Sequence, residues 1–85
     1  MRNTVLLRVD LTGDFKPLSE GTLVATFALL ASEKNTQDVL VSDGKGAEID
    51  LAAGREFRFE RVDLSELQVK SKAGEVVFVV GHTAG

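Results

Sequence analysis

The sequence predicts an all-β fold, a small antiparallel β-sandwich or jelly-roll-like barrel of about seven or eight short strands. Apolar and polar residues alternate with a period of two in several segments, most cleanly in residues 55–61, which read REFRFER. Turn signals rich in glycine separate these segments along the whole chain. A chain of 85 residues leaves room for one hydrophobic core, so we expect a single β domain over residues 1–85.

Most of the expected strands follow directly from this alternation. They cover residues 4–12, 38–42, 47–51, 55–61, 67–70 and 75–81. Residues 15–18 contain the only proline, so this segment is expected to be extended and to lie at an edge. Residues 62–66 are expected to form a loop or a single helical turn. Residues 21–32 fit either a helix or a strand, and their Thr, Val and Phe content favours the strand.

The composition argues against several kinds of site. The chain has no cysteine and a single histidine, His82, which excludes disulfides, thiolate zinc sites and multi-histidine metal sites. Its net charge of −3 argues against a nucleic-acid partner, which would favour a basic surface. Phe57 and Phe59 alternate with charged residues, so we expect them in the core rather than on a base-stacking platform.

Two clusters of carboxylates have simple structural explanations. Asp43, Glu48 and Asp50 lie near a glycine-rich turn but lack the spacing of a calcium-binding loop, and we expect solvated turn charges. Asp63 and Glu66 are expected to cap a short turn rather than to act as an acid–base pair. We therefore expect no catalytic residue, no cofactor, no metal site and no enzymatic activity.

Sorting the alternating residues onto two faces leaves too many apolar residues for one core. The expected core comprises Val5, Leu7, Val9, Leu11, Leu23, Phe27, Leu29, Val39, Val41, Ile49, Leu51, Phe57, Phe59, Val69, Val76, Phe78 and Val80. The opposite face should be polar in a sheet exposed to water. Instead it carries Leu6, Val24, Leu30, Leu40, Val77 and Val79, with Ala28 beside them. We expect these residues to contact another subunit or partner, unless loops or a helix at 22–32 cover them.

The apolar run at residues 5–7 is too short for the core of a signal peptide, which needs about 7–15 apolar residues. No stretch approaches the roughly 20 apolar residues of a membrane-spanning helix. We therefore expect no membrane partner.

Several residues from about position 18 onward occur in a familiar order. Ala31 and Asn35 precede the strand at 38–42, and a turn ending in Gly54 precedes the segment Asp63-Leu64-Ser65. The dipeptide Ala73-Gly74 then precedes the last strand. In this order the chain is similar, from about residue 18 onward, to small structural proteins of tailed bacteriophages, and the first strand lies outside the resemblance.

The resemblance implies a non-enzymatic virion protein, such as a capsid decoration or cement protein, a head-fibre base or a minor tail component. The partners it implies are further copies of the chain, with a trimer favoured, and a major capsid or other virion protein. A chain running from Met1 to Gly85 is expected to be a free-standing product with both ends held in place. Two other functions stay open, a cellular β-sandwich module for protein interaction and an oligonucleotide-binding barrel.

Overall fold

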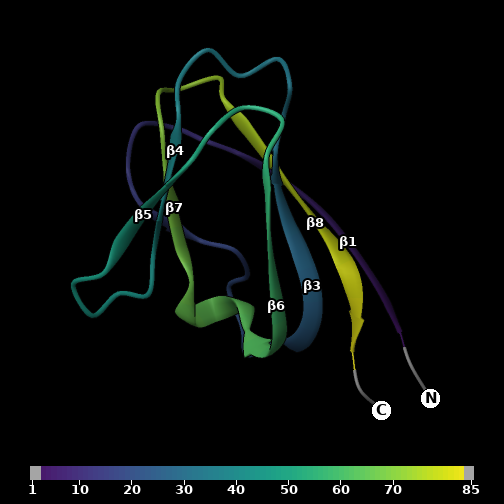
Figure 1. Ribbon diagram of the computed structural model, residues 1–85. Coiled ribbons are helices and arrows are strands. Elements are labelled where there is room, and N and C mark those ends of the chain that lie inside the picture. Colours follow the sequence, from purple (N-terminus) through teal and green to yellow (C-terminus); the bar gives the residue numbers. More distant parts are fainter. Residues whose placement is uncertain (1–2, 84–85) are drawn as a thin grey trace.

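The computed structural model describes residues 3–83, which form two four-stranded antiparallel sheets stacked face to face (Figure 1). The strands are β1 (Thr4–Asp10), β2 (Lys16–Pro17), β3 (Val24–Ala31), β4 (Val39–Ser42), β5 (Glu48–Leu51), β6 (Glu56–Asp63), β7 (Gln68–Lys70) and β8 (Val76–Thr83). A short 3-10 helix, η1 (Leu64–Glu66), precedes β7. The predicted all-β fold is confirmed, whereas the expectation about Met1 and Gly85 lies outside the described residues.

The connectivity is that of a long hairpin rolled up on itself. β1 pairs with β8, β2 with β7, β3 with β6 and β4 with β5, so the first half of the chain runs antiparallel to the second. Rolling this ribbon brings β3 against β8 and β4 against β7. The result is sheet A, in the order β1-β8-β3-β6, and sheet B, in the order β2-β7-β4-β5. Such a two-sheet arrangement of eight strands is a jelly roll.

The segment that fits both helix and strand in the sequence is a strand, β3. It lies inside sheet A and pairs with β8 on one side and β6 on the other. Every second side chain, Ala25, Phe27, Leu29 and Ala31, is buried in the core. The central position explains the outcome, because β3 satisfies the backbone groups of both neighbouring strands.

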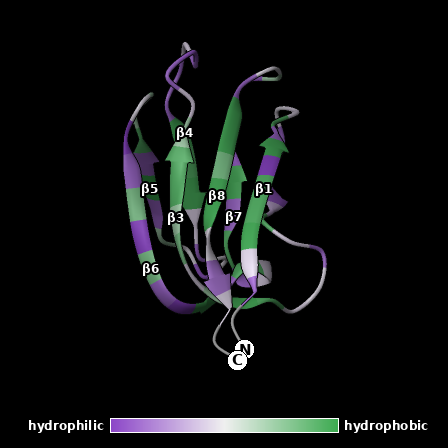
Figure 2. Ribbon diagram, turned by 90° about the vertical axis from the view of Figure 1, so that its right-hand side faces the viewer, coloured by the Kyte–Doolittle hydropathy of each residue, from purple (hydrophilic) through white to green (hydrophobic). Residues whose placement is uncertain are grey.

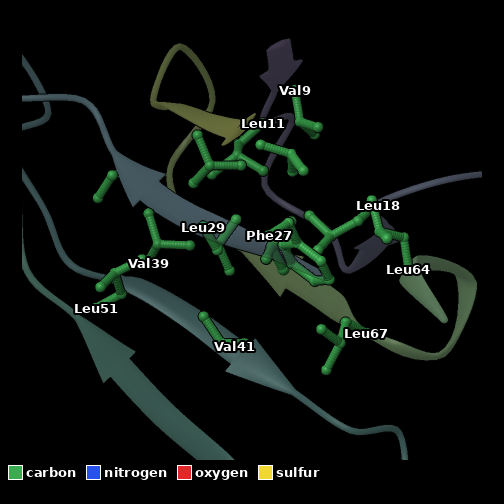
Figure 3. Packing of buried hydrophobic residues seen from close by; sticks show 14 of the residues in the cluster. Val9, Leu11, Leu18, Phe27, Leu29, Val39, Val41, Leu51, Leu64 and Leu67 are labelled. Atoms are coloured by element: carbon green, nitrogen blue, oxygen red, sulfur yellow. The ribbon is translucent and has the colours of Figure 1, made fainter. Parts of the chain in front are cut away.

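The core lies between the two sheets and takes side chains from both of them (Figure 3). Its largest fully buried side chains are Leu29, Leu51, Leu64, Val39, Val69, Val77 and Val79. The ring of Phe27 on β3 stacks on that of Phe59 on β6, with ring centroids 5.1 Å apart. Phe59 is half-buried at the margin of this cluster, in agreement with its expected place in the core rather than on an exposed platform.

Strand β8 presents the opposite faces from those expected. Val77 and Val79 are both 0% exposed and belong to the core, whereas Phe78 and Val80 are 36% and 48% exposed. The prediction that Val77 and Val79 contact a partner is therefore wrong, as is the placing of Phe78 and Val80 in the core. The run from 76 to 80 is apolar at every position, so its alternation carries no information about which residues face inward.

Gly81 explains which face of β8 turns inward. It lies opposite Phe27 of β3, and a Cβ at position 81 would collide with the Thr26 carbonyl oxygen and the Phe27 backbone. Only glycine fits where the two strands approach so closely. Since side chains alternate along a strand, Val79 and Val77 share the inward side of Gly81.

Two further members of the expected core lie elsewhere. Val76 is half-buried on the outer side of β8, and Ile49 is 60% exposed. Ile49 pairs with Val41 and faces the same way, but β5 is an edge strand that sheet A does not fully cover. Other residues complete the core that the alternation did not select, namely Leu18, Ala25, Ala31, Leu64 and Leu67.

Candidate functional site

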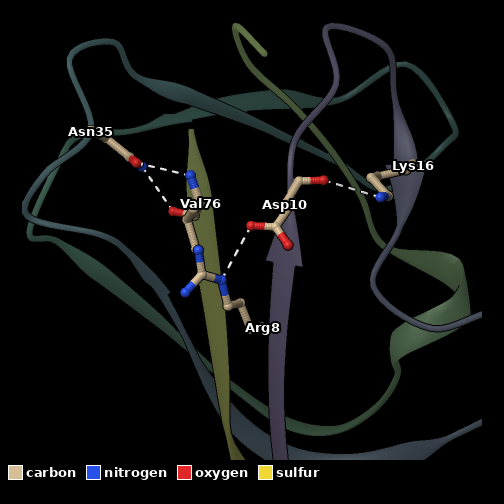
Figure 4. A network of polar contacts seen from close by, with 5 residues as sticks. All are labelled: Arg8, Asp10, Lys16, Asn35 and Val76. Carbon is tan, nitrogen blue, oxygen red and sulfur yellow. Dashed lines mark hydrogen bonds and ion pairs between the residues drawn. The ribbon is translucent and has the colours of Figure 1, made fainter. Parts of the chain in front are cut away.

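The residues that carry the resemblance to phage proteins build the fold. Asn35 holds the start of β8, because its Nδ2 donates to the Val76 carbonyl and its Oδ1 accepts from the Val76 N–H, both at 2.9 Å (Figure 4). Gly54 and Gly74 occupy turns with φ of 78° and 98°, a region that favours glycine. These residues therefore hold strands and turns of the fold in place.

Asp63 is the N-cap of η1. One carboxylate oxygen accepts hydrogen bonds from the Leu23 N–H and the Ser65 N–H, both at 3.0 Å, and from the Ser65 hydroxyl at 2.8 Å. The Leu23 N–H, followed by the two Ser65 donors, holds the pKa of Asp63 below its ordinary value. The carboxylate therefore serves to connect η1 with the start of β3, and Glu66 is exposed and takes no part.

Glu75 is a buried carboxylate, 7% exposed, directly before β8. It accepts hydrogen bonds from the Thr36 N–H at 2.7 Å, the Thr36 hydroxyl at 3.1 Å and the Gln37 N–H at 3.3 Å. Burial acts to raise the pKa of Glu75, but the Gln37 and Thr36 donors and the charge of Lys72 together outweigh it and lower the pKa. Glu75 thus fastens the loop before β4 to sheet A as a charged group with satisfied hydrogen bonds.

The acidic cluster near the glycine-rich turn does not form a metal centre. Asp43 Oδ1 accepts from the Lys45 N–H at 2.7 Å and from the Ala47 N–H at 3.3 Å, which closes the turn between β4 and β5. Glu48 and Asp50 are exposed on the edge strand β5. Within residues 3–83, no three His, Asp or Glu side chains come together as metal ligands do.

The most extensive apolar area on the surface of the described residues is the outward side of sheet A. Strand pairing aligns its outward side chains in two rows, Leu6–Val80–Ala28–Arg58 and Arg8–Phe78–Leu30–Glu56. These eight residues are called the outer face of sheet A below. Leu6 is 69% exposed, and hydrophobic residues run along β1, β8 and β3 whereas β6 alternates (Figure 2). Contiguous apolar patches of this kind mark interaction sites in proteins.

The outer face has a ridge and a hollow. Leu6, Val80 and Phe78 form the ridge along β1 and β8, where they are the most exposed apolar side chains. A hollow of about 380 Å³ lies beside it over the small side chain of Ala28, with Arg58 on its far wall. His82 closes one end of the hollow, and its Nδ1 is buried without a hydrogen-bond partner among residues 3–83.

Charged side chains border the apolar rows at both edges of sheet A. On β1, Arg8 Nε lies 3.2 Å from Asp10 Oδ1 (Figure 4). On β6, Arg58 Nε lies 3.4 Å from Glu56 Oε2. Both pairs are exposed, so each contributes little to the stability of the monomer and its charges stay available to a partner.

The six residues predicted to form an interface do not form one surface. Leu6 and Leu30 lie in the two rows of the outer face, and Val24 is the first residue of β3, on the same side and 47% exposed. Leu40 is half-buried and lies on β4, which belongs to sheet B.

The other two predicted interface residues, Val77 and Val79, are in the core, as described above. Their places on the outer face are taken by Phe78 and Val80, which the alternation did not select. The available signal was Gly81, because a strand glycine often marks a close backbone approach and would have set the inward side of β8.

A smaller apolar opening lies between the edge strands β5 and β6. It has a volume of about 170 Å³ and is bordered by Val41, Ile49, Phe57, Phe59 and Leu67. It arises because β5 and β6 are the edge strands of different sheets and do not pair with each other.

Within residues 3–83, no helix has the length and apolar character that a membrane crossing requires.

No protein-family model matches the chain, and neither a curated protein nor a solved structure matches it. The resemblance to phage structural proteins therefore stays a prediction from the sequence, and the functional argument rests on the outer face of sheet A.

Proposed function

We propose that the chain is a non-enzymatic structural protein of a tailed-phage virion, a capsid decoration or cement protein or a head-fibre base, localised in the virion. The observation that carries the proposal is the outer face of sheet A, on which Leu6, Val80 and Phe78 expose apolar side chains in adjacent positions. Each square ångström of such a surface removed from water contributes about 25 cal/mol to binding before its costs. The face is thus suited to hold a neighbouring protein.

The fold suits a protein that binds neighbours and carries out no reaction. The outer face lies on a continuous four-stranded sheet, so its side chains are held in place before a partner arrives. The two carboxylates with lowered pKa values, Asp63 and Glu75, each hold backbone N–H groups of the fold. A decoration protein needs such a rigid support, since its task is to add binding free energy between capsid subunits.

The strand connectivity also bears on the two other functions. An oligonucleotide-binding barrel is a five-stranded, partly open barrel, whereas residues 3–83 form two sheets of four strands. A cellular interaction module would use the same outer face with a different partner. The experiment below separates it from a virion protein.

The test is co-sedimentation of the purified chain with empty heads of the phage that encodes it. We expect saturable binding and a rise in the temperature at which the heads come apart. Leu6→Asp should abolish binding, because it buries a charge where the outer face meets its neighbour on the head, whether that neighbour is capsid protein or a further copy of the chain. Ile49→Asp is the matched control, an exposed aliphatic side chain on sheet B, and should bind as the parent does. Absence of binding by the parent chain, or equal loss in both variants, would refute the proposal.

A further inference from the structure

We propose that the outer face of sheet A binds a second copy of this chain through a two-fold axis that runs parallel to the strands, between β8 and β3. The inference rests on the proposed function, because it takes the outer face as a docking surface and names its occupant. Three properties of the face support a second copy in this orientation, namely its register, its relief and its charges.

The register determines which residues would meet. A two-fold axis parallel to the strands stacks β1 on the partner's β6 and β8 on the partner's β3, and it keeps each row at its own level. In the first row, Val80 then lies over Ala28 of the partner subunit. In the second row, Phe78 lies over Leu30 of the partner subunit.

The relief of the face is complementary to itself in this orientation. Val80 of the ridge enters the hollow over Ala28 of the partner subunit, while its neighbour Leu6 lies over Arg58 of the partner subunit at the wall of that hollow. The reverse contacts form at the same time. A two-fold axis across the strands would instead stack β8 on β8. With that axis between the two rows, Val80 would press against Phe78 of the partner subunit, and the hollow over Ala28 would face Leu30 of the partner subunit instead of a residue of the ridge. Interiors of proteins are close-packed, so the arrangement that fills the hollows is favoured.

The charges at the rim are complementary in the same orientation. Arg8 and Glu56 end the same row, Arg8 on the edge strand β1 and Glu56 on the edge strand β6. The parallel axis places each Arg8 above Glu56 of the partner subunit, and this contact occurs twice. Packed sheets lie about 10 Å apart, with their strands within about 30° of each other. The long side chains of Arg8 and Glu56 can together bridge this distance.

The area of the face predicts a weak dimer. Four strands about 4.8 Å apart and about 25 Å long present roughly 500 Å² on each copy, or roughly 1,000 Å² in total. Stable complexes usually bury about 1,200–2,000 Å², so we expect a concentration-dependent dimer with a dissociation constant in the micromolar range. The register of the two rows and the charges at their ends, described above, favour a two-fold dimer over the trimer that the resemblance implies.

The experiment is sedimentation equilibrium over about 1–500 μM protein, with charge exchange at the rim. Arg8→Glu and Glu56→Arg should each weaken the dimer about tenfold, and the double variant should restore it to within about threefold. Within one chain the two residues lie three strand spacings apart, roughly 14 Å, so recovery can arise only between chains. Glu48→Arg makes the same charge change on β5 of sheet B, away from the outer face of sheet A, and is the matched control.

The possible outcomes separate the inference from the proposed function. A monomer at every concentration, a trimer, or a double variant as weak as the singles would overturn the two-fold arrangement. All three exchanged residues are exposed, so circular dichroism should show an unchanged fold. If the chain binds phage heads as a monomer, the proposed function stands and the dimer falls; a dimer that binds no heads would give the reverse result.

Discussion

Replacing two adjacent residues of β8 tests which side of the strand faces the core. Val77→Ala removes two buried methyl groups from a side chain that is 0% exposed. At about 0.8 kcal/mol per buried carbon, the transfer cost is about 1.6 kcal/mol, and the remaining cavity adds roughly 1 kcal/mol. Phe78→Ala removes more atoms, but the ring borders water and leaves no closed cavity. We expect this second variant to lose only about 1–1.5 kcal/mol.

The assay is urea unfolding followed by far-ultraviolet circular dichroism, because the chain contains neither Trp nor Tyr for fluorescence. A protein concentration of about 5 μM limits how much association can add to the measured stability. The informative result is the order of the two variants, with Val77→Ala less stable than Phe78→Ala. If Phe78→Ala costs about 3–5 kcal/mol and Val77→Ala less than about 1 kcal/mol, the assignment of the two faces is refuted.

Three other perturbations test the contacts around β8. Gly81→Ala should destabilise the chain by about 2–3 kcal/mol in thermal unfolding, because its Cβ would overlap the backbone of β3. Gly21→Ala, which meets open space, is the control and should change stability little. Asn35→Ala should lower the free energy of unfolding by about 1–3 kcal/mol and speed hydrogen exchange at the Val76 amide. Unchanged exchange would contradict the role of Asn35 in holding the start of β8. Stability should be fully present above the ordinary Glu75 pKa of 4.5 and should fall as the pH drops through the lower folded value, because the unfolded chain takes up the proton first. In the variant Glu75→Gln, urea unfolding across that pH range should show a smaller dependence of stability on pH.

Most of the fold could be predicted from local sequence patterns. Residues 55–61 alternate Phe57 and Phe59 with charged neighbours, and β6 (Glu56–Asp63) forms there. The proline at 17 and the glycine-rich turn at 43–46 locate an edge strand and a reversal of the chain, since each restricts the backbone directly. Even the uncertain segment at 21–32 could be assigned to a strand, because Thr and Val favour one and every neighbouring segment is β.

The candidate site was harder to predict than the fold. Leu6 could be recognised as outward-facing because it shares one side of the strand with the charged residues Arg8 and Asp10. No such polar marker exists in the apolar run of β8, and Phe78 and Val80 were therefore assigned to the wrong side. Leu40 was grouped with Leu6 although it lies on the other sheet, since alternation identifies a face of one strand and not the sheet to which that strand belongs.

The sequence by itself determined that the chain is all-β, where its turns lie and which side of each alternating strand is apolar, because these are properties of neighbouring residues. The tertiary structure decided which strands pair, which way β8 faces and how the outer face is assembled. Strand pairing joins residues as distant in sequence as Leu6 and Val80, and the contact of Gly81 with Phe27 exists only once β8 lies against β3. Such long-range contacts depend on the whole fold, and so does the outer face of sheet A, through which we propose that this protein binds its partners.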